Sequence, residues 1–297
     1  MSATPLSTSI DRTQHSPAAS RGLRFYWKRL LRFKLGLAAI LVLILLYLIA
    51  IFGPYVIDKD PNQISFLEQL SGSSSKHWLG TDSTGRDVFA RLIYGGRVSL
   101  FVSALAVLIS TVVGMTLGAL SGFYGGFVDS IIMRCTDATL AIPNFLLVLV
   151  AITIFGASLG HLVIAIGLTS WMTVTRLVRG DFLRLRDTEF VEAARSIGAT
   201  NRRIILRHIL PEVFSPVIVA SSTYVGSVVL LEAALSYLGL GIQPPDASWG
   251  NMLSNAQDYM WNRPMLAVYP GLALVITVVA FNYSGEAIRR VLNVREA

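Results

Sequence analysis

The sequence predicts an all-α membrane protein with six transmembrane helices, and three observations lead to this fold class. The 297-residue chain is 53% apolar and only 14% charged, whereas soluble domains carry about 25% charged residues. The deficit falls in a few long uncharged runs, each near the ~20 residues that a helix needs to cross a bilayer. Lysine and arginine gather in alternate connecting segments, as in chains that cross a membrane several times.

Glycine-rich breaks divide the uncharged runs into six spans. Gly122-Phe-Tyr-Gly-Gly126 separates the second span from the third, and Gly156 to Gly160 turns the chain after the third. Pro143 is predicted to kink the third span. The predicted spans are approximately 35–57, 98–121, 127–155, 161–177, 213–238 and 264–288.

The segments outside the spans have distinct characters. The first residues are polar and rich in Ser and Thr, a composition that predicts disorder. Arg86 to Val98 is predicted to form an amphipathic helix on the outer surface, with Val88, Leu92 and Ile93 as its apolar stripe. We divide the chain into a disordered cytoplasmic tail (1–24), the first transmembrane helix with an extracytoplasmic loop (25–97), a helical core that includes a cytoplasmic loop at 178–212 (98–290), and a C-terminal tail (291–297).

The distribution of positive charge orients the chain. Of the 25 lysines and arginines, 18 lie before the first span, between the fourth and fifth spans, or after the last. With six spans these three segments share one side of the membrane. Since positive segments stay in the cytoplasm, both termini and residues 178–212 are predicted to be cytoplasmic.

The basic balance of the chain does not indicate nucleic-acid binding. The net charge is +7, but the charges lie beside apolar runs rather than along one polar face, and membrane topology explains this placement better. We expect membrane lipid and no nucleic acid around the chain. Cys135 is the single cysteine, so no internal disulfide forms, and we expect this residue to be buried.

The cytoplasmic loop 178–212 has the pattern of two short amphipathic helices. Phe190, Ala193, Ala194 and Ile197 follow the i, i+3, i+4, i+7 spacing of one apolar helical face. Glu192 is expected to pair with Arg195 on the polar side. The first helix is predicted to end at Gly198 in a left-handed conformation. Thr200 is expected to cap the second helix, and Pro211 to close it before the fifth span.

The apolar face of the first short helix has two interpretations. Small residues beside bulky ones allow another protein to approach closely, as when a helix docks in a partner's groove. The same face would equally suit packing on the protein's own helix ends. Composition alone leaves both interpretations open.

The run Glu192-Ala-Ala-Arg-Ser-Ile-Gly198, followed after nine residues by His208-Ile-Leu-Pro211, resembles the EAA loop of permease subunits of binding-protein-dependent ABC importers. His208 departs from the usual Ile of that motif. The similarity to the dipeptide/oligopeptide C-type permeases extends, in order, over roughly residues 25–290. Further similar segments are His77–Asp87, Tyr94–Leu100, Gly122–Gly126, Tyr237–Pro245, Ser248–Leu253 and Ala280–Asn282.

This resemblance implies the type I ABC importer permease fold in the inner membrane of a prokaryote. The loop would then form the coupling helix that docks on a cytoplasmic ATPase and switches the permease between inward-facing and outward-facing states. The implied cargo is di- or oligopeptides, although nickel and glutathione importers share the motifs. The implied coupling residues are Phe190, Glu192, Ala193, Ala194, Ile197, Gly198 and Pro211.

The resemblance also implies partners. They are a second permease chain forming a heterodimer, two ATPase subunits and an extracytoplasmic substrate-binding protein. The sequence contains no Gly-Lys pair and so no phosphate-binding Walker A pattern. We therefore expect a non-catalytic transport subunit that binds no cofactor, with ATP and Mg held by the partner ATPases.

Four polar residues are candidates for the substrate pathway or its gates. Glu232 lies near the outer end of the fifth span, either as an outer gate or ammonium contact, or as a snorkelled or helix-paired carboxylate. Arg134 and Asp137, at i and i+3, are predicted to pair at the inner end of the third span, as a switching contact or as a static ion pair. Asn282, from the resembling segment 280–282, completes the set.

Two other functional classes are less consistent with the sequence. A secondary transporter would not need a docking loop and often shows internal repeats, of which none is evident. An intramembrane enzyme would need catalytic groups at one depth, yet none of the histidines lies in the centre of a span.

Overall fold

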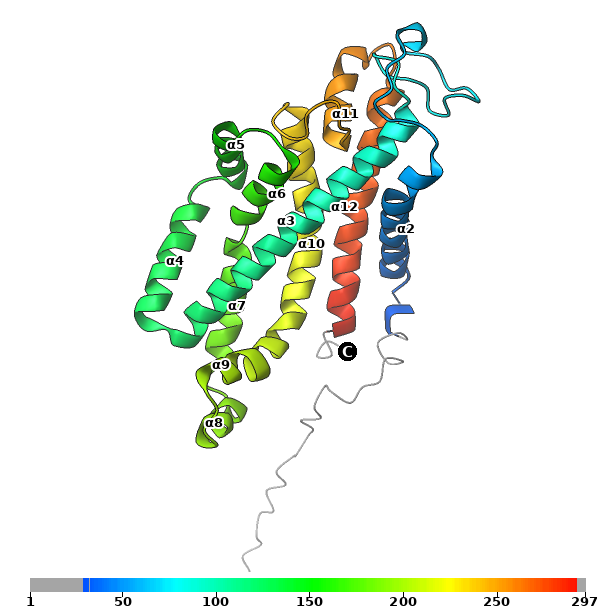
Figure 1. The fold of residues 1–297 in the computed structure, drawn as a ribbon. Helices are drawn as coiled ribbons and strands as arrows, with labels where there is room; N and C mark the ends of the chain where they lie inside the picture. Colours follow the sequence, from blue (N-terminus) through cyan, green and yellow to red (C-terminus); the bar gives the residue numbers. More distant parts are fainter. Residues whose placement is uncertain (1–28, 32, 293–297) are drawn as a thin grey trace, which may run out of the picture.

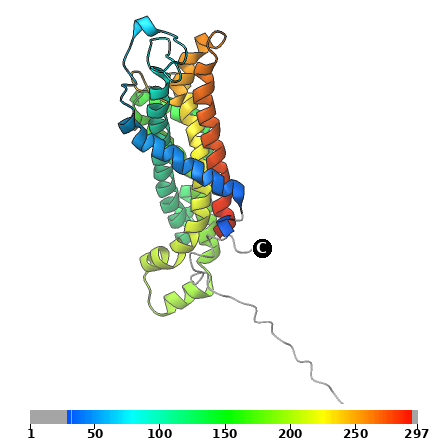
Figure 2. The same ribbon diagram turned by 90° about the vertical axis from the view of Figure 1, so that its right-hand side faces the viewer.

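The computed structural model describes residues 29–31 and 33–292. The predicted tail at 1–24 lies outside these residues, and so do residues 293–297 of the predicted tail at 291–297. The described part is helical, and its helices run mostly along one direction as a bundle (Figure 1). Figure 2 shows α2 crossing this bundle obliquely. The elements are α2 (Lys34–Val56), η2 (Phe66–Glu68), α3 (Val88–Tyr124), α4 (Gly126–Leu140), α5 (Asn144–Phe155), α6 (Leu159–Leu168), α7 (Met172–Leu185), α8 (Glu189–Ser196), α9 (Asn201–Arg203), the π-helical η3 (Ile204–Ile209), α10 (Leu210–Tyr237), α11 (Trp249–Ala256), η4 (Gln257–Tyr259) and α12 (Met265–Leu292).

Six spans are confirmed within the described residues, provided that one bent pair counts as a single span. Five helical stretches are long and apolar enough to cross a membrane, and α4 with α5 makes the sixth. The five are Lys34–Val56, Val88–Tyr124, Leu159–Leu185, Asn201–Tyr237 and Met265–Leu292.

The predicted kink of the third span at Pro143 is confirmed as a sharp bend. Its two helices are bent by 86° at the break. The proline ring at Pro143 cannot continue a helix past the preceding turn, and Pro143 has an extended ψ of 130° as it caps α5. The break therefore turns the chain sharply.

The predicted surface helix at Arg86–Val98 is also corrected. Residues 88–98 form the first turns of α3, which continues without interruption to Tyr124. Asp87 begins the helix, since its side chain accepts a hydrogen bond from the Ala90 amide at 2.9 Å. α3 thus joins the extracytoplasmic loop directly to the membrane interior.

Cys135, expected to be buried, is exposed on α4.

Three glycines spaced four apart on α3 bring α7 into backbone contact. A Cβ added at Gly114 would lie 2.6 Å from Val174 Cβ, and one at Gly118 would lie 2.7 Å from the Thr175 carbonyl oxygen. At Gly122 it would lie 2.5 Å from Phe182 Cβ. Small residues at this spacing allow membrane helices to approach closely.

The extracytoplasmic loop is organised by buried and half-buried charges. Asp87 accepts hydrogen bonds from Lys59 Nζ at 2.7 Å and pairs with His77 Nδ1 at 2.8 Å. Asp82 accepts from Arg86 Nε at 2.7 Å. Arg91, only 2% exposed, donates from Nη1 to Pro61 O at 3.2 Å and Pro245 O at 3.4 Å. The Lys59, Pro61 and Pro245 contacts each tie a different segment of the outer face to α3.

The contact between α3 and α7 gives a first prediction. Gly118→Leu should lower the free energy of unfolding by about 1–3 kcal/mol, because extra atoms must enter a filled contact. Thermal unfolding of the detergent-solubilised chain measures this. Gly180→Leu on α7 is the matched control, since nothing lies within 4 Å of its added Cβ. Equal destabilisation by the two variants would contradict the packing account.

A second prediction concerns pH. Burial by itself raises the pKa of the Asp82 carboxyl, but the Arg86 charge and hydrogen bonds from Thr84 outweigh it, so the net pKa lies below its ordinary value. Burial likewise raises the pKa of Asp87, and hydrogen bonds from Lys59, the Ala90 amide and His77 outweigh it, so this pKa is also lowered. A lowered folded-state pKa contributes stability that is fully present above the unfolded value of about 3.9.

This stability must therefore disappear as the pH falls below about 4, through the folded-state pKa values. The protection of the amides in residues 58–91, taken relative to their intrinsic exchange rate at each pH, should fall between pH 5 and pH 3 (about the range that brackets the carboxyl titration). Asp87→Asn should lower this protection already at pH 7 and make it less sensitive to acid. Protection that is unchanged by acid would rule out this role for the carboxylates.

Candidate functional site

The cytoplasmic loop 178–212 contains the short helix α8, whose ends carry charges that suit its dipole. Thr188 precedes it in an extended conformation, with Glu189 and Glu192 in the first turn and Arg195 in the last. Acids near a helix N-terminus and bases near its C-terminus are favourable. The predicted Glu192–Arg195 ion pair is not among the ion pairs of the described residues; Arg195 instead lies over the Phe123 ring, 5.9 Å from its centroid.

The predicted left-handed end of this helix is confirmed at Gly198. Its φ is +81°. The Gly198 amide donates to Arg195 O at 2.9 Å, and the Ala199 amide donates to Ala194 O at 3.0 Å. This pair of bonds is the Schellman arrangement, which satisfies the last carbonyls of a helix. Nothing lies within 4 Å of an added Cβ, so backbone conformation, rather than space, favours glycine here.

Thr200 begins the next helical stretch as predicted, because its side chain accepts a hydrogen bond from the Arg203 amide. Pro211 does not close that stretch: helix continues through Pro211 into α10. Proline lacks the amide for an i−4 bond and its ring crowds that carbonyl. The π-helical η3 absorbs the change, since the Leu210 amide bonds to Ile205 O, five residues back.

The predicted apolar face of α8 divides between two sides. Val191 (0% exposed) and Ala194 (4%) pack into the protein's own core with Phe182, Ile204 and Ile209. Ala194 is therefore not an outward contact, contrary to expectation.

The remaining residues of that face point outward. Phe190 is 42% exposed and Ile197 is 84% exposed, and Ala193 between them is also exposed. Glu192 and Gly198 are exposed as well. One side of α8 thus packs on the protein itself, and the other side is exposed. Docking of the exposed side on a partner stays a prediction.

Charged contacts secure the loop to the membrane helices. Arg186 Nη1 donates to Gly122 O at 3.3 Å, beside the end of α3. Arg179 binds Asp129 of α4 through two bonds of 2.6 and 2.7 Å. Paired guanidinium–carboxylate bonds are among the stronger polar contacts.

The predicted Arg134–Asp137 pair is wrong. Asp137 bonds instead to Arg176 of α7 at 2.6 Å, and no ion pair within the described residues involves Arg134. Both acids of α4 thus face the neighbouring helix rather than the next turn of their own. Sequence spacing could not show this, because the partner arginines follow a reversal of the chain.

Glu232 lies near the outer end of α10, as expected, but is fully buried. Its Oε1 accepts a hydrogen bond from Ser236 Oγ at 2.7 Å, one helical turn away. The hydroxyls of Ser99 and Ser248 lie close to the same carboxyl. In this conformation the carboxyl joins α3, α10 and the start of α11, and it is not open to a solute.

Two further residues complete the comparison with the sequence. Asn282, exposed on α12, donates to Val278 O on its own helix at 3.0 Å. Trp249 is buried and its indole donates to Leu92 O at 3.0 Å, which explains its place at the start of α11. The sequence interpretation did not include the close contact between α3 and α7, although Gly114, Gly118 and Gly122 form a repeat of small residues that indicates it.

Residues 114–296 match the family model described as the binding-protein-dependent transport system inner membrane component. The chain belongs to this family of inner-membrane permeases. Residues 23–72 match the N-terminal transmembrane domain of oligopeptide transport permease C.

Curated relatives are similar over nearly the whole permease. It is 41% identical over 271 residues to the glutathione transport system permease protein GsiD of Pectobacterium atrosepticum, covering 91% of this chain and 90% of the relative. It is 38% identical over 267 residues to the dipeptide transport system permease protein DppC of Alkalihalophilus pseudofirmus, covering 90% and 88%. Membership in this family excludes the secondary transporter.

A solved structure shares the fold. A chain of the MetNI methionine ABC transporter, in an inward-facing conformation, matches with a TM-score of 0.56 and 19% identity, covering 68% of this chain and 97% of that chain. The predicted type I ABC importer permease fold and inner-membrane location are confirmed.

The helix end at Gly198 gives a third prediction. A left-handed conformation raises the free energy of a residue with a Cβ by about 1–2 kcal/mol, and that of Asn by less. Gly198→Val should therefore speed amide exchange at residues 195–199 about tenfold or more, and Gly198→Asn should do so much less. Equal exchange in the two variants would show that the left-handed conformation does not stabilise the loop.

Proposed function

We propose that this permease carries di- or oligopeptides from an extracytoplasmic binding protein into the cytoplasm, driven by ATP hydrolysis in partner subunits. The relatives named for dipeptide and glutathione transport support a small peptide as the cargo. Glutathione is itself a tripeptide, and the 41% identity to a glutathione permease makes it the second candidate. The chain is a transport subunit and not an ATPase.

The observation that carries the coupling role is the outward face of α8. Phe190, Ala193 and Ile197 form an exposed apolar surface on a loop that is otherwise anchored by Val191, Ala194 and charged contacts. Exposed apolar surface on a rigid support is typical of a docking site. We assign this surface, with Glu192 and Gly198, to the ATPase contact, and Ala194 and Pro211 to holding the loop in place.

A second permease chain is the partner within the membrane. An apolar groove of about 740 Å³ runs between α2, α3, α10 and α12, and the described α4 contributes only Thr136 to the buried core. Membrane helices that leave such surfaces uncovered are suited to another helical subunit. Two ATPases and the binding protein complete the complex.

For the pathway, Glu232 is assigned to closing the outer end. A carboxyl buried among Ser99, Ser236 and Ser248 holds three segments together, and separating them would open that end. Arg134 and Asn282 are also assigned to the pathway. Asp137 is assigned to it as well, through its ion pair with Arg176 of α7.

The fourth prediction tests coupling and cargo together. The chain is co-produced with its partner permease, ATPases and binding protein, reconstituted, and assayed for ATP hydrolysis stimulated by peptide-loaded binding protein. Phe190→Ala with Ile197→Ala should lower stimulation about tenfold or more, because a few buried anchors dominate such contacts. Arg202→Ala, an exposed change on α9, is the control and should leave stimulation unchanged.

Each outcome has a distinct meaning. Stimulation by glutathione-loaded but not dipeptide-loaded binding protein would move the cargo to glutathione. Full stimulation of the Phe190/Ile197 variant would remove the docking role from α8. Failure of the wild-type chain to assemble with any ATPase would reject the coupling assignment altogether.

A further inference from the structure

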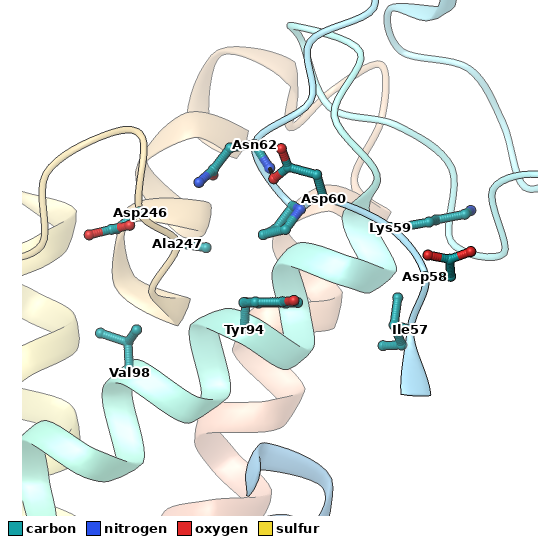
Figure 3. Close-up of a pocket in the computed structure, with 10 residues that line it drawn as sticks. Ile57, Asp58, Lys59, Asp60, Asn62, Tyr94, Val98, Asp246 and Ala247 are labelled. Atoms are coloured by element: carbon teal, nitrogen blue, oxygen red, sulfur yellow. Dashed lines mark hydrogen bonds between the residues drawn. The ribbon is translucent and has the colours of Figure 1, made fainter. Parts of the chain in front are cut away.

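A pocket of about 480 Å³ opens on the extracytoplasmic face (Figure 3). Three segments far apart in the sequence form it: residues 57–62 after α2, Tyr94 and Val98 of α3, and Asp246 with Ala247 before α11. Its volume lies within the range of about 300–1,000 Å³ that small-molecule sites occupy.

Most of the charged side chains that line this pocket are acids, and the buried Arg91 guanidinium behind its wall attracts Asp246 without forming an ion pair with it. Asp58, Asp60 and Asp246 line it, and no ion pair of the described chain includes any of them. Lys59 is the lining residue of opposite charge, but its ammonium binds Asp87 at 2.7 Å. Figure 3 shows the Lys59 side chain directed away from the space between Asp60 and Asp246.

The floor of the pocket is apolar and aromatic. Tyr94 and Val98 lie on one face of α3, with Ala247 beside them. An aromatic face next to carboxylates favours an organic ammonium group, which gains from both. No group of three metal-ligating side chains within the described residues is close enough to hold a metal ion.

The walls are fixed before any ligand arrives. Buried Arg91 donates to Pro61 O, Asn62 Oδ1 and Pro245 O at 3.2, 3.3 and 3.4 Å, so one guanidinium joins two of the three lining segments to α3. A preorganised site loses less free energy on binding than one that must be ordered.

A further acid, Glu232, lies behind the pocket and accepts a hydrogen bond through one of its two oxygens. Val98 and Ala247 line it, and the residues that follow them, Ser99 and Ser248, lie close to the carboxyl of Glu232. Glu232 is 0% exposed, and its Oε2 has no hydrogen-bond partner in the described chain. Carboxyl groups therefore follow one another from the outer surface towards the membrane interior.

We propose that this outer pocket receives the cationic amino end of the transported peptide, with Asp58, Asp60 and Asp246 as its counter-charges and Tyr94 as its floor. The proposal rests on the peptide cargo assigned above. It adds a binding site on the permease itself, outside the binding protein, that a substrate meets on entry.

The test measures binding without the binding protein. The assembled complex, in lipid nanodiscs, is titrated calorimetrically with alanyl-phenylalanine amide, which carries one positive charge and no carboxylate. N-acetylation of this probe removes the charge and should abolish binding. Replacing the three aspartates together by asparagine should weaken affinity about tenfold or more, since each exposed ion pair contributes up to about 1 kcal/mol.

Asp258→Asn is the matched control, because Asp258 is an exposed acid of η4 outside the pocket; it should leave affinity unchanged. Asp60→Asn and Asp246→Asn, tested singly, should each weaken binding by a smaller factor, which keeps the test decisive if the triple variant does not assemble. Equal affinity for the acetylated probe, or for the aspartate variants, would overturn the proposal.

Peptide uptake into proteoliposomes separates this site from the cargo assignment. If the wild-type complex binds the amide through the aspartates but imports no peptide, the pocket stands and the peptide cargo fails. If it imports peptide while the aspartate variants bind and import as the wild type does, the cargo stands and the pocket fails. If the variants change only the half-saturating concentration of binding protein, the pocket instead holds a basic side chain of that protein.

Discussion

The close approach of α3 and α7 is the constraint on which the rest of the permease depends. Three glycines bring two backbones into contact within the membrane, where no hydrophobic effect drives helices together and dense packing must do so. α7 leads directly into the cytoplasmic loop, so its fixed position also fixes α8. The ion pairs from Asp129 and Asp137 then attach α4 to the same helix. Fold and candidate site are thus parts of one arrangement.

Much of this could be predicted from the sequence. Uncharged runs and the distribution of arginine gave the span count and the orientation, and the left-handed end of α8 followed from Gly198 because few other residues adopt that conformation cheaply. Local rules failed where residues distant in sequence decided the outcome. Asp137 pairs with Arg176 rather than Arg134, and Pro211 is accommodated by a π-helical segment rather than ending a helix.

The candidate site, too, could be predicted only in part from the sequence. The apolar spacing in α8 left packing on the protein and docking on a partner as open interpretations. In the structure Ala194 packs, Phe190 and Ile197 are exposed, and Val191, which lies outside the predicted stripe, is fully buried. The outer pocket could not be found from sequence at all. Asp60 and Asp246 are brought together only by the folded extracytoplasmic loop, and the side chain that holds their segments, Arg91, is hidden within α3.

The unbroken length of α3 has a mechanical consequence. Its 37 residues form a rod of about 55 Å, which starts at the capping carboxylate of the outer loop and ends beside the arginine that secures the cytoplasmic loop. A lever of this length needs little rotation: tilting it by about 5° around its midpoint moves each end by about 2 Å, in opposite directions. Events on the two sides of the membrane are therefore connected through one stiff element rather than a chain of flexible joints.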